Sequence, residues 1–165
     1  LEMVVAKRFS FVRFGHSMRI TELEAAIGVA QFEGWEQNIG SRKKIAGFYS
    51  KQLSKFSSQI QLPRVPDHCD NNFMMFPIVL KHEKKDKLVN FLEKNNIETR
   101  DMVPLTNQPV YRKVYGEDLE DRYPVAKWLN ESGFYIGSHP YLKAKETKYV
   151  VEKIAQYLGQ AAPAA

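Results

Sequence analysis

The residues best suited to chemistry lie near the start of the chain, in a short polar and basic segment, Gly15–Arg19, that runs directly into a predicted helix. Ser17 offers a hydroxyl and Arg19 a forked cation, and the free amides of a helix N-terminus follow them. Such a combination can bind a phosphate or a carboxylate. A turn in which Arg19 pairs with a neighbouring glutamate is the alternative, and the residues alone leave both interpretations open.

A second polar segment, Thr106-Asn107-Gln108, places three uncharged hydrogen-bonding side chains in a row. Side chains of this kind bind sugars or carboxylates, but they also simply form turns. The other reactive residue types give no pattern. The four histidines are widely spaced, and the neighbours His68, Cys69 and Asp70 would point in different directions, so no metal site is predicted. Glycine-rich phosphate loops and the G-x-S-x-G motif are absent from the sequence, so spacing alone assigns no reaction.

Composition indicates one globular domain or a large piece of one: 165 residues, of which 44% are hydrophobic and 26% charged. The net charge of +5 favours anionic partners, but Lys84, Lys85 and Lys87 alternate with Glu83 and Asp86, which is typical of solvated helix faces rather than of a nucleic-acid surface. A single cysteine excludes an internal disulfide and fits a reducing, cytoplasmic setting. Because the chain starts at Leu1 without a methionine, we expect it to be a piece of a longer protein.

The first predicted elements are two helices. Thr21 and Glu24 have the spacing of a capping box, and apolar residues then recur at helical spacing, which predicts a helix over 21–35. Gly34 and Gly40 weaken the pattern before a second helix over 41–55. A loop over 57–70 follows.

The rest of the chain predicts a compact α/β unit. Asn72–Leu80 reads as a strand, and Pro77 within it indicates an edge strand or a bulge. Asn95 and Asn96 are expected to end a helix over 86–94, because asparagine tolerates the left-handed conformation. Further strands are predicted at 97–100 and 134–136, and helices at 109–115, 123–132 and 145–158. The predicted fold class is therefore α/β, with about three short strands and helices packed on one face; residues 1–20 form an arm, 21–158 the domain and 159–165 a disordered tail.

The chain resembles a known family along most of its length. Gly15–Gly28, GHSMRITELEAAIG, resembles the signature G-Y-N-Y-R-M-T-E-L-Q-A-A-I-G of the DegT/DnrJ/EryC1/StrS aminotransferases, which are pyridoxal-phosphate sugar aminotransferases. Later segments resemble the family's F-P-I, F-L-K-E-x-G-I-E-T-R, P-L-H-x-Q-P-x-Y and L-P-V-A motifs, in the same order, at residues 76–78, 91–100, 104–111 and 123–126. The likeness covers residues 14–158.

This resemblance implies the small C-terminal domain of the aspartate-aminotransferase fold. In the family, a preceding large domain carries the lysine that binds pyridoxal phosphate covalently, so the chain alone is not expected to bind the cofactor or to catalyse. The parent enzyme would transfer an amino group from glutamate to a keto sugar nucleotide and would act as a homodimer, with no nucleic acid or membrane as partner. Two alternatives stay open: a dehydratase of the same family, in which that lysine is replaced by histidine, and a stand-alone, non-catalytic binding module.

The resemblance also assigns site residues. Ser17, at the position of the family's asparagine, and Arg19 are expected to contact the cofactor phosphate across a dimer interface. His16 replaces an aromatic residue and is expected to line the substrate site. Thr106 stands where the family commonly has histidine, which is a departure, and Asn107 and Gln108 follow it as expected substrate contacts. His139, in a loop that varies within the family, is a further expected substrate contact.

Overall fold

The structure is a computed structural model that describes residues 16, 18–102, 105–116 and 119–160. The chain divides into two compact units, Leu1–Trp35 and Glu36–Ala165. In the first unit, helix α2 (Glu22–Glu33) begins at the predicted capping box: the Thr21 hydroxyl accepts a hydrogen bond from the Glu24 amide, and the Glu24 carboxylate accepts one from the Thr21 amide. Gly34 follows as the C-cap. The predicted helix start is confirmed.

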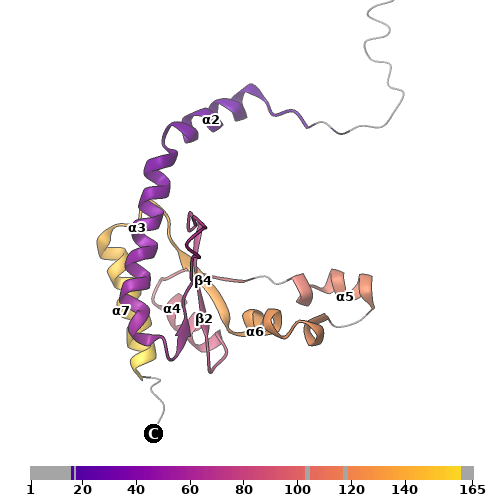
Figure 1. Ribbon diagram of the computed structural model, residues 1–165, viewed down its shortest axis with the longest axis vertical. Helices are drawn as coiled ribbons and strands as arrows, with labels where there is room; N and C mark the ends of the chain where they lie inside the picture. Colours follow the sequence, from indigo (N-terminus) through magenta and orange to yellow (C-terminus); the bar gives the residue numbers. More distant parts are fainter. Residues whose placement is uncertain (1–15, 17, 103–104, 117–118, 161–165) are drawn as a thin grey trace, which may run out of the picture. The chain divides into compact units, whose positions relative to one another are not determined.

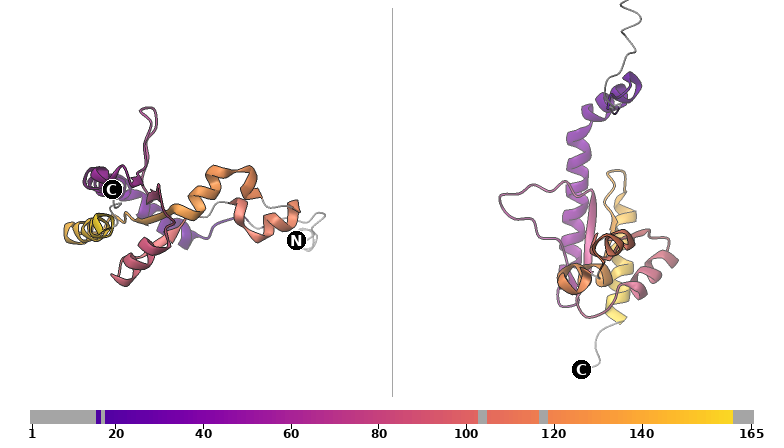
Figure 2. Two further views of the ribbon diagram at one scale, coloured as in Figure 1. Left: turned by 90° about the horizontal axis from the view of Figure 1, so that it is seen from below. Right: turned by 90° about the vertical axis from the view of Figure 1, so that its right-hand side faces the viewer.

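The second unit is built around an antiparallel sheet of four strands in the order β1-β2-β4-β3 (Figures 1 and 2). The long strands are β2 (Met75–Leu80) and β4 (Gly133–Gly137), and the short ones are β1 (Ile60–Gln61) and β3 (Thr99–Asp101). In register, Phe76 pairs with Ile136 and Thr99 pairs with the same Ile136 from the other side. The predicted α/β fold class is confirmed, and the sheet gains a fourth strand, β1, from the segment predicted as a loop.

Three helices cover one face of this sheet and enclose the core: α3 (Trp35–Leu53), α4 (Asp86–Lys94) and α7 (Ala144–Gln160). Alternate residues of β2 and β4 point to this face because side chains alternate along a strand. The core residues from strands and helices are Ile60, Phe76, Ile78, Leu80, Phe134 and Ile136, with Ile45, Ala46, Tyr49, Leu53, Leu88, Leu92, Ile97, Val151, Ile154 and Leu158.

The remaining helices belong to an excursion of the chain between β3 and β4. It contains the 3₁₀ turn η2 (Leu105–Asn107), helix α5 (Pro109–Tyr115), the 3₁₀ turn η3 (Leu119–Arg122) and helix α6 (Pro124–Ser132). Figure 1 shows α5 and α6 on the side of the sheet away from α3 and α7. A further 3₁₀ turn, η1 (Ser54–Phe56), follows α3.

One local prediction about backbone conformation is confirmed, and another holds only in part. Asn96, which follows the C-cap Asn95 of α4, has the left-handed φ of 58° that ends the helix. Strand β2 is not the edge strand that Pro77 predicted, because it lies between β1 and β4. Pro77 pairs with Tyr135 of β4, and among the described residues β1 pairs only with Val79 and Leu80, so the other side of β2 carries no strand at Pro77. A residue without an N–H group is therefore tolerated there.

The predicted weakening of the helical pattern at Gly34 and Gly40 is confirmed at Gly34 and is wrong at Gly40. Helix α3 begins at Trp35, six residues before the predicted start, and Gly40 lies inside it. The interruption falls instead at Gly34, between α2 and α3. One glycine costs a helix interior about 1 kcal/mol, which the packing of a long helix against the sheet easily exceeds.

Candidate functional site

The predicted cofactor contacts, Ser17 and Arg19, and the predicted substrate residue His16 precede α2. His16 and Arg19 are both exposed, and Ser17 lies outside the described residues. Two carboxylates, Glu22 and Glu24, occupy the first turn of α2. Hydrogen bonds from the Thr21 amide and then from its hydroxyl lower the pKa of Glu24, so this group is ionised at neutral pH. Because these charges already complement the helix dipole, a phosphate here would depend on side chains such as Arg19 rather than on the helix end.

Helix α2 exposes apolar side chains on two opposite sides, with glutamate and glutamine side chains between them. At 100° per residue, Leu23 and Ile27 lie on one side and Val29 and Phe32 on the opposite side, and all four are more than half exposed. In the part of the chain that the structure describes, α2 has no buried residue. Large apolar side chains exposed in this number mark contact surfaces, so α2 presents surfaces for contact on two sides.

The predicted substrate residues Thr106, Asn107 and Gln108 lie together at the start of the excursion. Thr106 and Asn107 belong to η2, and Gln108 is the N-cap of α5, whose first residue is Pro109. The Gln108 side-chain amide donates to Asn107 Oδ1 at 2.6 Å. Among the described residues, the Thr106 hydroxyl oxygen is buried without a hydrogen-bond partner. A buried hydroxyl without a partner is unfavourable, because it has lost its hydrogen bonds to water without compensation.

The remaining predicted substrate residue, His139, lies two residues beyond the other end of β4, in a different environment. The excursion adjoins the Gly133 end of that strand, and five strand residues span about 16 Å, so the structure does not bring His139 together with Thr106. The Tyr141 amide donates to His139 Nδ1 at 3.4 Å. With Nδ1 acting as acceptor, the neutral imidazole carries its proton on Nε2.

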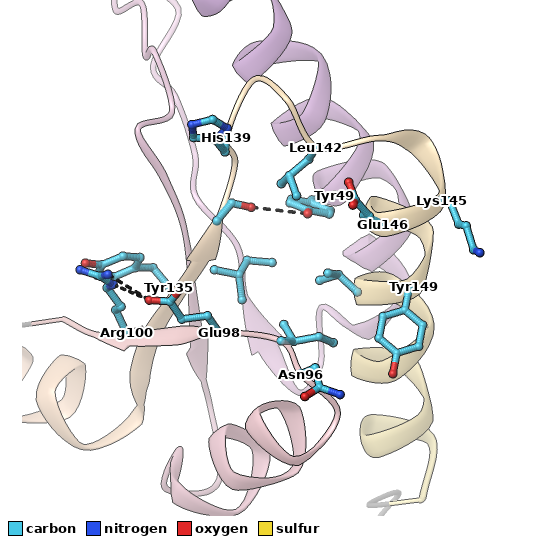
Figure 3. Close-up of a pocket in the computed structure, with 14 residues that line it drawn as sticks. Tyr49, Asn96, Glu98, Arg100, Tyr135, His139, Leu142, Lys145, Glu146 and Tyr149 are labelled. Carbon is cyan, nitrogen blue, oxygen red and sulfur yellow. Dashed lines mark hydrogen bonds and ion pairs between the residues drawn. The ribbon is translucent and has the colours of Figure 1, made fainter.

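His139 stands at the rim of a cavity of about 770 Å³ that the sequence did not predict (Figure 3). Its lining is mostly apolar and includes Ile97, Ile136, Leu142 and Val150. Lys145, Glu146 and Tyr149 of α7 also line it, on one side (Figure 3). The hydroxyl of the buried Tyr49 donates to the Gly137 carbonyl at 3.5 Å. Burial, and then the Glu146 charge, raise the pKa of Tyr49 to about 12, so this hydroxyl remains a donor at neutral pH.

Sequence reasoning also missed Lys85. The charge pattern of residues 83–87 predicted solvated side chains, yet Lys85 is only 9% exposed and is the one buried lysine among the described residues. Its Nζ donates to the Asn130 carbonyl at 2.6 Å and lies 2.9 Å from Asp101 Oδ1. This ammonium is therefore engaged, and it is not a free amine.

The donor set of this chain fits pyridoxal phosphate only in part. Arg19 is a suitable partner for the phosphate or for a substrate carboxylate. A lysine that could bond to the cofactor in a pocket is not found among the described residues, because Lys85 is held by Asp101 and Asn130 and the other lysines are half-exposed or exposed. The chain therefore offers contacts to such a cofactor without a complete site for it.

Comparison with known proteins places these features in one family. Residues 2–155 match the DegT/DnrJ/EryC1/StrS aminotransferase family. The chain belongs to this family. Its relatives include the lipopolysaccharide biosynthesis protein RfbH of Salmonella typhimurium, 27% identical over 92% of this chain and 36% of the relative, and the GDP-perosamine synthase of Escherichia coli O157:H7, 28% identical over 87% of this chain and 38% of the relative.

A dehydratase is also among the relatives: the dTDP-4-dehydro-2,6-dideoxy-D-glucose 3-dehydratase of Saccharopolyspora spinosa is 26% identical over 93% of this chain and 34% of its own length. The fold agrees with that of a putative sugar aminotransferase of Streptococcus pneumoniae in its PMP form, at a TM-score of 0.82 and 18% identity, over 93% of this chain and 39% of that protein. The chain thus spans about two fifths of the length of the relatives it matches. Within the described residues, no helix combines the length and apolar character needed to cross a membrane.

Proposed function

We propose that this chain is the C-terminal small domain of a pyridoxal-phosphate-dependent aminotransferase that transfers an amino group from glutamate to a keto sugar nucleotide. The observation that carries the proposal is the family match over residues 2–155, which includes both polar segments that the sequence singles out. The names of the relatives support the substrate class, because a GDP-perosamine synthase acts in the formation of an amino sugar nucleotide. The reaction itself belongs to the longer protein.

The exposed apolar surface of α2 supports a shared site. Leu23 and Ile27 on one side, and Val29 and Phe32 on the other, need cover from two directions. In this proposal the large domain of the same protein covers one side and a second copy of the protein covers the other. Residues 16–19, directly before α2, then reach the cofactor of the neighbouring subunit.

Each residue before α2 has a specific role in the proposal. The Arg19 guanidinium holds a phosphate or the substrate carboxylate with two parallel hydrogen bonds. Ser17 donates a single hydrogen bond to the cofactor phosphate, where an asparagine amide would offer two. His16 lines the substrate pocket. When bound, pyridoxal phosphate supplies the electron sink for the exchange of the amino group, and the protein supplies position and electrostatics.

The excursion between β3 and β4 supplies the sugar contacts. The Thr106 hydroxyl, buried without a partner among the described residues, donates to or accepts from a sugar hydroxyl. Asn107 and Gln108, which bond to each other at 2.6 Å, present their remaining amide groups beside it. His139 contacts a different part of the substrate, because it follows the far end of β4.

Cofactor titration of this chain beside the longer protein tests the proposal. We expect the longer protein to show the absorbance change of bound pyridoxal phosphate. We also expect it to aminate a keto sugar nucleotide with glutamate, and mass spectrometry of the product detects this. The chain alone should show no such change. An absorbance change that appears with the chain alone and disappears in Lys85→Met would place the cofactor on Lys85 and contradict the assignment to a domain outside this chain.

A dehydratase is the second candidate, and the relative from Saccharopolyspora spinosa favours it. The same cofactor would then serve the elimination of water from a keto sugar nucleotide, in which a hydroxyl group and a hydrogen on the neighbouring carbon leave together. The two functions give products of different mass from the same substrate. An aminated sugar nucleotide supports the aminotransferase, and a dehydrated one supports the dehydratase.

A further inference from the structure

The described residues of the excursion that carries Thr106, Asn107 and Gln108 contribute nothing to the apolar core. Among the described residues, the core and the apolar side chains packed on it include Ile97 and Phe134 but none from 98–133. Figure 1 shows the chain leaving the sheet after β3, running out to α5 and returning through α6. Something other than core packing must therefore fix this segment to the rest of the unit.

The two ends of the excursion meet at Lys85. Its Nζ lies 2.9 Å from Asp101 Oδ1, at the last residue of β3, where the excursion begins. The same Nζ donates to the Asn130 carbonyl at 2.6 Å, and the Lys85 amide donates to the Glu131 carbonyl at 3.1 Å, both in the last turn of α6, where the excursion ends. We propose that Lys85 is a positioning residue that holds both ends of the excursion together and thereby fixes Thr106, Asn107 and Gln108.

Helix electrostatics explain why a lysine suits this place. The last carbonyls of a helix have no partner within the helix and carry partial negative charge, so a cation stabilises them. Helix α6 has no basic residue in its own last turn. Lys85, from the start of α4, supplies that cation and satisfies one of the carbonyls. Its burial also lowers the effective dielectric around the contact to Asp101.

Further hydrogen bonds connect the end of α6, which Lys85 holds, to the rest of the excursion. The Asn130 side-chain amide donates to Glu120 Oε1 at 3.2 Å, and Arg112 Nη2 lies 3.4 Å from Glu120 Oε2. These contacts connect α6 to η3 and η3 to α5, and η2 contacts all three. Fixing the end of α6 therefore restrains the turn that contains Thr106.

The neighbouring lysine provides a matched control. The Lys84 side chain is 65% exposed, and its Nζ lies 3.5 Å from Glu131 Oε1 in α6. Lys84 therefore also reaches the last turn of α6, but from the exposed surface. Lys85→Met keeps the apolar stem and removes the cation, and Lys84→Met makes the same chemical change next to it. Asp101→Asn removes the charge of a 66% exposed carboxylate, so we expect this variant to fold even where Lys85→Met does not.

Amide hydrogen exchange on the 165-residue chain is the direct test. We expect Lys85→Met to speed the exchange of the η2 and α5 amides at least tenfold, and Asp101→Asn about threefold, while the α3 and β2 amides stay within twofold of the wild type. Lys84→Met should change neither set. Unchanged exchange in η2 and α5 in Lys85→Met, or an equal increase at every amide, would overturn the proposal. If that variant does not fold, unchanged exchange in Asp101→Asn would do so.

A kinetic measurement on the longer protein then tests the consequence for the substrate, which rests on the proposed function. Lys85→Met should raise KM for the sugar nucleotide about tenfold and leave kcat within threefold, whereas a loss of folded enzyme would lower kcat alone. An unchanged KM would contradict a positioning role. If the wild type turns over no sugar nucleotide, the proposed function fails, and the exchange experiment still decides the role of Lys85.

Discussion

Gly133→Ala should be among the most damaging single-methyl changes in this protein. Gly133 is the first residue of β4 and the C-cap of α6, and its amide donates to the Leu129 carbonyl. A Cβ atom built there would lie 2.5 Å from Leu129 O and 2.9 Å from Met102 Sδ. The Met102 side chain is able to move aside, but the carbonyl belongs to the last turn of α6. The methyl group therefore forces the helix end and the strand apart.

The magnitude follows from two opposing contributions. Overpacking that requires a backbone shift costs about 1–3 kcal/mol, and the contact with a helix carbonyl places this site at the upper end. Alanine also restricts the unfolded chain, which stabilises the protein by about 0.4–1 kcal/mol. The backbone at Gly133, with φ −100° and ψ 137°, suits alanine, so conformational strain adds nothing. The net loss should be about 2 kcal/mol, or a Tm lower by roughly 4–8 °C.

Urea unfolding followed by circular dichroism measures this loss, and Gly137→Ala at the other end of β4 is its control. A Cβ at Gly137 meets nothing within 4 Å, so that variant should equal or slightly exceed the wild type in stability. The difference between the two variants isolates the steric contribution, because both change glycine to alanine in one strand. If Gly133→Ala unfolds within 0.5 kcal/mol of Gly137→Ala, an order-of-magnitude margin for unstrained surface sites, the steric argument is refuted.

Three further predictions concern single side chains. Gly47→Ala, in the interior of α3 with open space around it, should raise the free energy of unfolding by about 1 kcal/mol in the same urea experiment. The capping hydrogen bonds hold the pKa of Glu24 below its ordinary value. Their contribution to the stability of α2 is therefore complete above the ordinary pKa and is lost as the pH falls through the lowered pKa. NMR of the α2 amides should show fraying in acid, and Thr21→Val should show the same fraying already at neutral pH. The raised pKa of Tyr49, about 12 against 10.0, means that stability is complete below pH 10.0 and falls between the two values; stability curves at alkaline pH should lose this dependence in Tyr49→Phe, and an unchanged curve would contradict it.

The regular helices were the part most accessible from sequence. The helix at 86–94 was predicted to the residue, because Leu88 and Leu92 recur at helical spacing and Asn95-Asn96 supplies a left-handed stop. Helix α5 was predicted with equal accuracy over 109–115, from Pro109 at its first position. The structure adds that Gly116, with a φ of 70°, ends it. Local side-chain chemistry determines these boundaries, so local sequence is enough to find them.

Features that depend on distant partners were not predictable. Strand β1 is two residues long and exists only because Ile60 and Gln61 pair with Leu80 and Val79 of β2. Lys85 gave no signal of burial, because its partners Asp101 and Asn130 are separated from it by 16 and 45 positions in the sequence. The cavity near His139 likewise arises where β4, α3 and α7 meet. Residue type suggested Thr106 and Arg19 as site residues, but their surroundings came only from the structure.

Under the proposed function, Thr106, Asn107 and Gln108 contact the substrate from outside the core, so substrate preference would be able to vary separately from the core. Core residues are constrained by close packing, and a change of one methylene group is felt there. The excursion between β3 and β4 is joined to the core unit at its two ends, through Lys85, Asp101, Asn130 and the close contact of Met102 with Gly133, and through Trp128 of α6, whose Nε1 donates to the Leu80 carbonyl of β2. Its stability is therefore local, and residues within it can change without loss of the fold. Threonine at a position where the family commonly has histidine is the kind of change that this arrangement tolerates.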